Sequence, residues 1–178
     1  MNAWYDDTLT CVCITCPLPE QGGAVSVVAD RLVSAGLVLP EPPSALGDYV
    51  PAVRAGSLVF TSGQLPMKAG ALFASGLVGT DVPPELAAEC ARIAALNGLA
   101  AASTVCDLDE VIGVVRLTGY VASATGFTAQ PQVIDGASGV LLAAFGEAGR
   151  HAREAVGVAR LPKDAPVEVS IVLMLEDV

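Results

Sequence analysis

Residues 153–175 read REAVGVARLPKDAPVEVSIVLML, and this stretch decides the fold. From Val167 to Leu175, valine, isoleucine and leucine alternate with other residues, a pattern typical of a strand that buries one face. Residues Arg153–Arg160 predict a second strand, and the turn residues of Leu161–Pro166 separate the two. The chain therefore ends in two strands, the last of which contributes to the core.

Working outward from this stretch, hydrophobic periodicity predicts further strands and two helices. They are two antiparallel strands within Tyr49–Met67 that turn at Ala55-Gly56, a short strand at Ala71–Phe73, a helix from Pro83 to about Thr104, a buried strand at Val111–Ala122, a turn at Gly126–Gln132, and a helix over Ala137–Phe145 that ends in Gly146–Arg150. Strands and helices in this order predict an α+β sandwich, in which one sheet is backed by two helices.

The N-terminal part of the chain has a different character. Residues Val25–Ala35 predict a short amphipathic helix that stops at Gly36, and Pro40–Pro43 predicts an extended linker. We therefore expect residues 1–23 to be a tail that is not necessarily ordered, residues 24–45 to be a helix and a proline-rich linker, and residues 46–178 to be the main domain.

The amino-acid composition limits the classes of protein to which this chain can belong. The chain has 178 residues, 53% of them hydrophobic, which suits one domain with a sizeable core. Its mean hydropathy is +0.59, but polar residues interrupt its longest uncharged stretch, Leu117–Ile134, so we expect no membrane span and no signal peptide. The net charge of −10 makes nucleic acid an improbable partner. These features predict a soluble cytoplasmic protein.

Five cysteines are present in an uneven arrangement that does not predict a disulfide framework. Cys11, Cys13 and Cys16 form a cluster, but a metal site needs a fourth ligand, and His151 is the only histidine. We interpret the cluster as incidental thiols of the tail and predict no metal site. Cys90 and Cys106 are expected to be small buried residues.

Arg153 is the most informative cation. It shares one face of its strand with small residues, namely Ala155, Gly157 and Ala159, which lets another backbone approach closely. A guanidinium there can bind a carboxylate by two hydrogen bonds. The alternative is an ordinary ion pair with Glu154 or Glu168. The pair Arg150 and His151 suits the C-terminal end of a helix, and Arg160 and Lys163 are expected to be solvated or ion-paired.

Glu168 is the candidate acid. It lies on the face of the last strand that alternates with the apolar one. A partly buried carboxylate can act as a general base on water, whereas a solvated carboxylate on an edge strand is the simpler interpretation. The sequence contains neither a dinucleotide-binding nor a P-loop motif, and no nucleophile can be paired with His151 from sequence.

Three stretches resemble a known family. They are Leu46–Pro66 with LGDY and TSGQLP, Arg116–Val121 with RLTGYV, and Arg153–Asp164 leading into Glu168. In this order they resemble the reactive intermediate deaminase (Rid) family, also called YjgF-like and historically the L-PSP endoribonuclease family. The preceding helix, together with Gln130-Pro-Gln132, Asp135-Gly-Ala137 and Phe145–Arg153, is similar to the longer branch of that family.

The resemblance implies a chorismate-mutase-like subunit in a homotrimer, with three sites between subunits. It implies hydrolysis of 2-imino acids and their enamine tautomers to 2-oxo acids and ammonia, without a cofactor. By position, Arg153 would bind the substrate carboxylate, Glu168 would lie near the attacking water, and Tyr49, Ser62 and Ala155 would line the pocket. The small-residue strip beside Arg153 is then our candidate for the contact between subunits.

Two departures from the family pattern leave other functions open. Ala155 replaces a cysteine of deaminating members, and Gln130-Pro-Gln132 occupies the region where an asparagine is often found. One alternative is a non-catalytic trimer that binds a small carboxylate metabolite or a partner enzyme. A weaker one is an endoribonuclease, which the net charge disfavours although Arg150 and Arg153 form a local basic patch.

Overall fold

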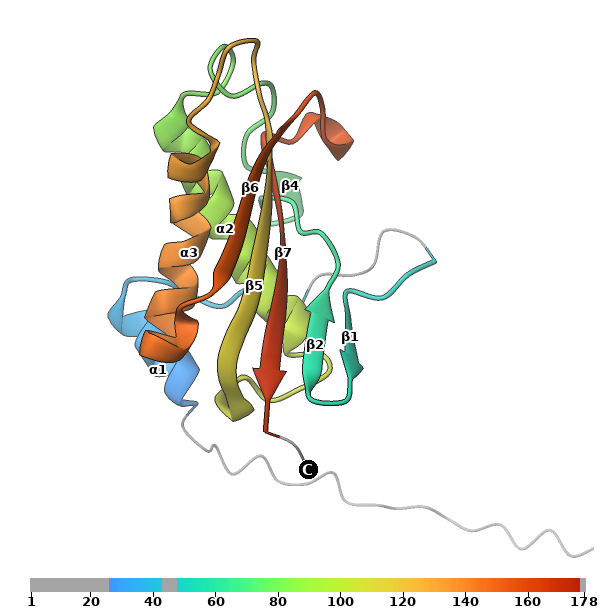
Figure 1. Ribbon diagram of the computed structural model, residues 1–178, viewed down its shortest axis with the longest axis vertical. Coiled ribbons are helices and arrows are strands. Elements are labelled where there is room, and N and C mark those ends of the chain that lie inside the picture. The colour runs from blue at the N-terminus through green and yellow to red at the C-terminus, as the bar shows by residue number, and fades with distance from the viewer. Residues whose placement is uncertain (1–25, 43–47, 177–178) are drawn as a thin grey trace, which may run out of the picture.

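The computed structural model describes residues 26–42 and 48–176, so the predicted tail and its three cysteines lie outside the described residues. Its main sheet has the spatial order β1-β2-β7-β5-β6, in which only the pair β5 and β6 is parallel (Figure 1). The strands are β1 (Ala52–Ala55), β2 (Leu58–Thr61), β5 (Val111–Ala122), β6 (Ala152–Val158) and β7 (Val167–Leu175), and a separate small sheet pairs β3 (Met67–Lys68) with β4 (Ala71–Leu72). The mostly antiparallel sheet confirms the predicted fold class.

Three α-helices accompany the sheet in the described part of the chain. They are α1 (Val27–Ser34), α2 (Pro84–Ala102) and α3 (Gln130–Phe145), with short 3-10 turns at Leu108–Glu110, Gly146–Gly149 and Pro162–Asp164. Helices α2 and α3 pack on one face of the sheet, and α1 lies against α3 (Figure 1). Strands β5 and β6 are parallel neighbours, and such strands need a crossover connection. Helix α3 lies in this connection and packs on the sheet. No helix of the described chain is both long and apolar enough to cross a membrane.

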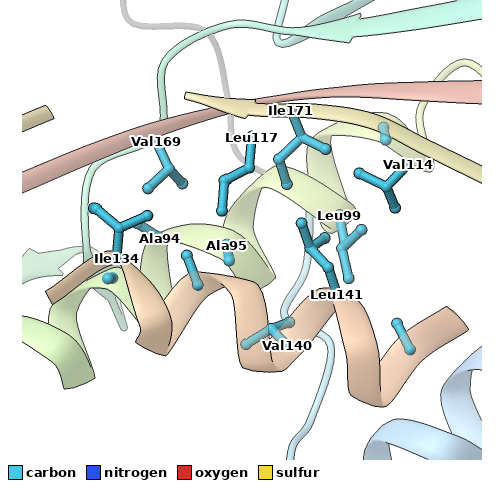
Figure 2. Close-up of a cluster of buried hydrophobic side chains, with 14 of the residues drawn as sticks. Ala94, Ala95, Leu99, Val114, Leu117, Ile134, Val140, Leu141, Val169 and Ile171 are labelled. Carbon is cyan, nitrogen blue, oxygen red and sulfur yellow. The ribbon is translucent and has the colours of Figure 1, made fainter. Parts of the chain in front are cut away.

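The core lies between the sheet and the two helices. Alternate residues of β7, such as Val169 and Ile171, are fully buried, and they face Leu99 of α2 and Leu141 of α3 across the layer (Figure 2). The intervening residues of β7 are only partly buried or exposed. The predicted alternation of the last strand is therefore confirmed, and it places Glu168 on the face away from the helices.

Small residues bring the layers close together. A Cβ atom on Gly136 of α3 would lie 2.1 Å from the backbone oxygen of Ala88 in α2. A Cβ atom on Gly119 of β5 would lie 2.4 Å from the Cδ1 atom of Ile134. Real Cβ atoms essentially never approach this closely, so a side chain at Gly136 would displace the α2 backbone and one at Gly119 would displace the Ile134 side chain. Glycine at these two positions therefore allows close contact between α2, α3 and the sheet within the chain.

Part of the small-residue strip of β6 packs inside the chain, and the expected contact of this strip with another subunit stays a prediction. Ala155 packs against the core, and a Cβ atom on Gly157 would lie 2.7 Å from the Nε2 atom of Gln130 in α3. The physical reason is the crossover, because α3 lies over this face of β6. Val156 points to the other face, where its side chain is exposed.

Helix α3 begins seven residues earlier than we predicted. The sequence predicts a turn over Gly126–Gln132, but the helix starts at Gln130 with Pro131 in its first turn. Proline is compatible with that position because the first N–H groups of a helix have no intrahelical partner. Gln130 stabilises the start by donating from Nε2 to the carbonyl oxygen of Phe127 at 2.8 Å. The predicted end is confirmed, since Gly146 follows the helix with φ of 61°.

The predicted N-terminal helix is also confirmed, and its docking depends on a distant residue. The carboxylate of Asp109 accepts hydrogen bonds from the backbone N–H groups of Val27 and Val28 at 3.0 and 2.9 Å. Leu32 of α1 is fully buried. A carboxylate at a helix N-terminus satisfies orphan donors and the helix dipole. Helix α1 is thus tied to the rest of the structure.

Candidate functional site

A cavity of about 640 Å³ lies at the end of β7 that carries Glu168. Its walls come from the residues just after β2, from α2, from the segment before β1 and from the turn before β7. Prolines, Leu65 and Met67 make much of the lining apolar, and the polar lining residues include Glu41, Tyr49, Gln64, Asn97, Lys163 and Glu168. An apolar cavity with a few convergent polar groups is the usual form of a small-molecule site.

Glu168 is the most distinctive group in this cavity. Its Oε1 atom lies so close to Gly63 that a Cβ atom there would be 1.8 Å away. Burial raises the pKa of the Glu168 carboxyl above its ordinary value. Among the described residues, no donor forms a hydrogen bond with this carboxylate and no cation pairs with it. Glu168 is therefore a half-buried carboxylate free to bind a water molecule or a ligand.

The cavity wall beside Glu168 is held by backbone hydrogen bonds. Gln64 and Val169 exchange two N–H to carbonyl bonds of 2.7 and 3.0 Å, which extends the pairing of β2 with β7 beyond the strand. The amide of Asn97 in α2 donates to the carbonyl oxygens of Leu65 and Met67 at 2.9 and 3.0 Å. These bonds fix the loop after β2 in relation to both β7 and α2.

Tyr49 and Ser62 lie near one another but have different positions with respect to the cavity. Tyr49 is among the lining residues, whereas Ser62 is not. The Ser62 hydroxyl donates to the carbonyl oxygen of Val50 at 2.7 Å, and its N–H donates to that of Pro51 at 2.9 Å. In the single chain, Ser62 thus positions the segment that carries Tyr49. Its predicted contact with substrate stays a prediction.

Arg153 lies away from this cavity in the single chain. Strand β5 separates β6 from β7, and Arg153 is on the face covered by α3 whereas Glu168 is on the opposite face. Its Nη1 atom donates to Oδ1 of Asp135 at 2.6 Å and to Oγ of Ser138 at 3.1 Å. The ion pair with Glu154 or Glu168 that we considered is therefore replaced by one with Asp135.

The comparison with protein families agrees with this architecture. A family model described as "YjgF/chorismate_mutase-like, putative endoribonuclease" matches residues 29–174. The chain belongs to this YjgF-like family. The matched residues begin inside α1 and continue almost to the end of β7.

The chain is also similar to individual proteins and solved structures. The chain is 38% identical over 160 residues to protein TCP17 of Trypanosoma cruzi, covering 86% of this chain and all of that protein. The crystal structure of a protein of unknown function from Agrobacterium tumefaciens is 40% identical with a TM-score of 0.77, over 84% of this chain and 92% of that one. The structure of E. coli TdcF with bound serine is 25% identical with a TM-score of 0.57, over 76% and 94% of the two chains.

The sequence did not predict several of the residues that form the walls of this cavity. They are Gly63, Gln64, Asn97 and Lys163. Asn97 carried a usable signal, because the other buried residues of α2 are alanine, glycine, leucine, isoleucine and cysteine. Gly63 carried none, since its close approach to Glu168 depends on how the segment after β2 lies across β7.

The other charged residues and cysteines that the sequence offered as possible functional residues have structural roles in the YjgF-like fold. Arg150 forms an exposed ion pair with Glu147 at 2.7 Å, and Arg160 forms one with Asp164 at 2.7 Å, as expected for solvated cations. Cys90 is fully buried, and burial raises the pKa of its thiol to about 11, so it is not a nucleophile at neutral pH. Within the described ranges, no group of three or more metal-ligating side chains is placed to bind a metal ion.

Proposed function

We propose that the protein hydrolyses 2-imino acids and their enamine tautomers to 2-oxo acids and ammonia. The observation that supports this most is Glu168, a half-buried carboxylate on a cavity wall with no protein partner among the described residues. A carboxylate with a structural role accepts hydrogen bonds from donors of the protein. One left without partners in a cavity is suited to hold a water molecule and accept its proton.

The chemistry needs little from the protein. An imine carbon is electrophilic, so catalysis is mainly the positioning of substrate and water. With the imine protonated on nitrogen, Glu168 accepts one proton from the water as the oxygen bonds to C2 of the substrate, which gives a neutral tetrahedral amino alcohol. Glu168 then returns this proton to the nitrogen. As the C–N bond breaks and ammonia leaves, the hydroxyl group gives its proton to Glu168 and becomes the carbonyl group of the 2-oxo acid. The raised pKa of Glu168 suits this use, because a base works best with a pKa close to the pH of the reaction.

The site would be completed by a second subunit of a homotrimer. A 2-imino acid carries a carboxylate, for which Arg153 is the proposed partner. Arg153 and Glu168 lie on opposite faces of one sheet, so one chain does not bring them to a common substrate. We propose that Arg153 of one subunit and Glu168 of its neighbour meet in a cleft between them. The structure of the relative TdcF with serine, an amino acid, favours a ligand with this carboxylate.

The main sheet has an uncovered face, which is the face that carries Glu168 and lies opposite α2 and α3, and this face supports the assembly. In the described chain no helix packs against that face, and it carries the exposed apolar side chains of Val53, Phe60, Val156 and Met174. Several exposed apolar residues on one face are typical of a protein interface. We therefore propose that the uncovered faces of three subunits meet in the trimer.

Phe60→Glu is expected to convert the trimer to monomers, because a carboxylate would then be buried without a partner at each interface. Sedimentation or light scattering would measure the mass. Leu142→Glu is the matched control, since Leu142 and Phe60 are both 42% exposed but Leu142 lies on α3, away from the uncovered face. A trimer that survives Phe60→Glu, or one that Leu142→Glu also dissociates, contradicts this interface.

The activity itself can be tested with 2-iminopropanoate, generated by an amino-acid oxidase and timed as it disappears with and without the protein. We expect the protein to accelerate its loss. No acceleration, together with no thermal stabilisation by pyruvate, rejects the proposed function. Stabilisation by pyruvate without turnover would instead favour the non-catalytic carboxylate-binding protein, which Ala155 in place of the family cysteine keeps as an alternative.

Arg153→Ala is expected to raise KM about 10- to 100-fold, because a charge-assisted hydrogen bond contributes about 1.5–3 kcal/mol. Initial rates over a range of 2-iminopropanoate concentrations measure the change. Arg92→Ala is the control, since Arg92 forms an exposed ion pair with Glu89 on α2 and should leave KM unchanged. Equal KM values for wild type and Arg153→Ala would show that Arg153 does not bind the substrate.

A further inference from the structure

We propose that Asp135, Ser138 and His151 are positioning residues, which hold the Arg153 guanidinium by one nitrogen and leave its opposite edge for the ligand carboxylate. This inference rests on the proposed role of Arg153 as the carboxylate-binding group. None of the three positioning residues needs to touch the substrate. Their effect would be to fix the direction in which Arg153 presents its free N–H groups.

The first observation is how the N–H groups of Arg153 are used. The Nη1 atom has two protons, and it has two acceptors, Oδ1 of Asp135 at 2.6 Å and Oγ of Ser138 at 3.1 Å. Both acceptors come from α3, three residues apart, and so from one side of the helix. Among the described residues, the Nε and Nη2 atoms of Arg153 have no hydrogen-bond partner.

The edge that stays free has the right geometry for a carboxylate. The N–H groups on Nε and Nη2 lie side by side and parallel, so they can bind both oxygens of one carboxylate. Arg150 of this chain uses the same edge on Glu147, with Nε donating at 2.7 Å and Nη2 at 3.4 Å. The side chain of Arg153 is 27% exposed, so part of it is open to solvent in the single chain.

The second observation is that the Ser138 hydroxyl is itself oriented. The Nδ1 atom of His151 lies 2.6 Å from the carbonyl oxygen of Gly149, which can only accept, so Nδ1 carries a proton. In the neutral ring Nε2 is then an acceptor, and it lies 3.1 Å from Oγ of Ser138. The hydroxyl therefore donates to His151 and turns its lone pairs toward Nη1 of Arg153.

These contacts form one directed chain of hydrogen bonds. Arg153 donates to Ser138, Ser138 donates to His151, and His151 donates to the backbone of Gly149. Residues 151 and 153 are two apart at the start of β6, so both side chains can face α3. The contact between α3 and β6 thereby sets the plane of the guanidinium. Ligand affinity would depend on this contact as well as on Arg153.

The ring nitrogens of His151 give a test that needs no activity. His151 is the only histidine, so its ring 15N signals in the full chain are assigned without ambiguity. We expect the neutral ring to carry its proton on Nδ1. A proton on Nε2 would reverse the bond to Ser138 and would overturn the proposal.

Enzyme kinetics test whether this chain of hydrogen bonds positions Arg153 to bind the substrate. Ser138→Ala removes the hydroxyl and is expected to raise KM for 2-iminopropanoate about fivefold to tenfold with kcat changed less than about twofold. Ser138→Thr keeps the hydroxyl and should restore KM. His151→Phe should raise KM, and His151→Gln, which keeps an acceptor, should raise it less. Ser34→Ala is the control, because that helical hydroxyl bonds only to the carbonyl of Asp30.

The outcomes separate this inference from the proposed function. If wild type hydrolyses 2-iminopropanoate and Ser138→Ala has the same KM, the positioning role is wrong while the function stands. If wild type neither hydrolyses 2-iminopropanoate nor is stabilised by pyruvate, the function fails and this inference fails with it. A change in kcat alone would show a role in the chemical step and would also contradict the inference.

Discussion

Replacing Glu168 by glutamine is expected to lower kcat for 2-iminopropanoate hydrolysis about 100-fold or more, the usual contribution of a general base. The amide has nearly the same size, so it fits the same space beside Gly63. It cannot accept the proton of the attacking water at neutral pH. Rapid initial-rate measurements at saturating substrate would give kcat for both proteins.

The control for this variant is Glu89→Gln, the same substitution at an exposed position on α2. It should leave kcat unchanged. If Glu168→Gln retained most of its activity, the water would have to be activated by another group, and the proposed role of Glu168 would be wrong. Binding of pyruvate by the inactive variant would show that the site is still formed.

Glu168→Gln also has an expected effect on stability, with a sign that follows from the raised pKa of Glu168. Below the ordinary carboxyl pKa, the group is protonated in both the folded and the unfolded chain and does not affect their balance. As the pH rises, the unfolded chain loses this proton first, so stability is lost up to the folded-state pKa. Glutamine avoids this loss. We therefore expect the variant to melt at a higher temperature than wild type at neutral pH and to show no such advantage in acid.

Gly136→Ala is expected to lower the free energy of unfolding by about 2 kcal/mol or more. The new Cβ atom would lie 2.1 Å from the oxygen and 2.9 Å from the carbon of the Ala88 carbonyl, which are backbone atoms of α2. Helices α2 and α3 would have to move apart. Overpacking of this kind costs about 3 kcal/mol. Alanine regains about 1 kcal/mol in helix propensity, which does not offset the cost.

Gly139→Ala is a matched control on the same helix. No atom lies within 4 Å of the position that its Cβ atom would occupy, so only the gain in helix propensity applies. We expect this variant to be more stable than wild type by about 0.5–1 kcal/mol. Urea unfolding of both variants measures the difference. Equal effects of the two substitutions would show that α2 and α3 are not in close contact at Gly136.

The success of the sequence predictions depended on whether the pattern was local. The alternation of Val167–Leu175 and the helical repeat of α2 are properties of neighbouring residues, and both elements were placed correctly. The start of α3 was misplaced because Pro131 and its flanking glutamines resemble a turn. Proline is equally compatible with a first helical turn, and only packing of that turn decides between the two.

The candidate site was predictable only in part. The resemblance indicated Arg153, Glu168, Tyr49 and Ser62 by position, and the structure places Glu168 and Tyr49 on one cavity. The sequence held no sign that Gly63 approaches Glu168 or that Asp135 pairs with Arg153, because these contacts join residues 105 and 18 positions apart. Such contacts follow from the register of β7 and from the path of α3.

Local patterns in the sequence predict most of the elements and the chemical groups of this protein, including a guanidinium and a carboxylate fifteen residues apart on its last two strands. The position of β5 between those strands, and the opposite directions of the two groups, become visible only in the folded chain. The physical reason is that side-chain alternation sets which residues share a face of one strand, whereas the pairing of strands is set by the crossover helix and its packing.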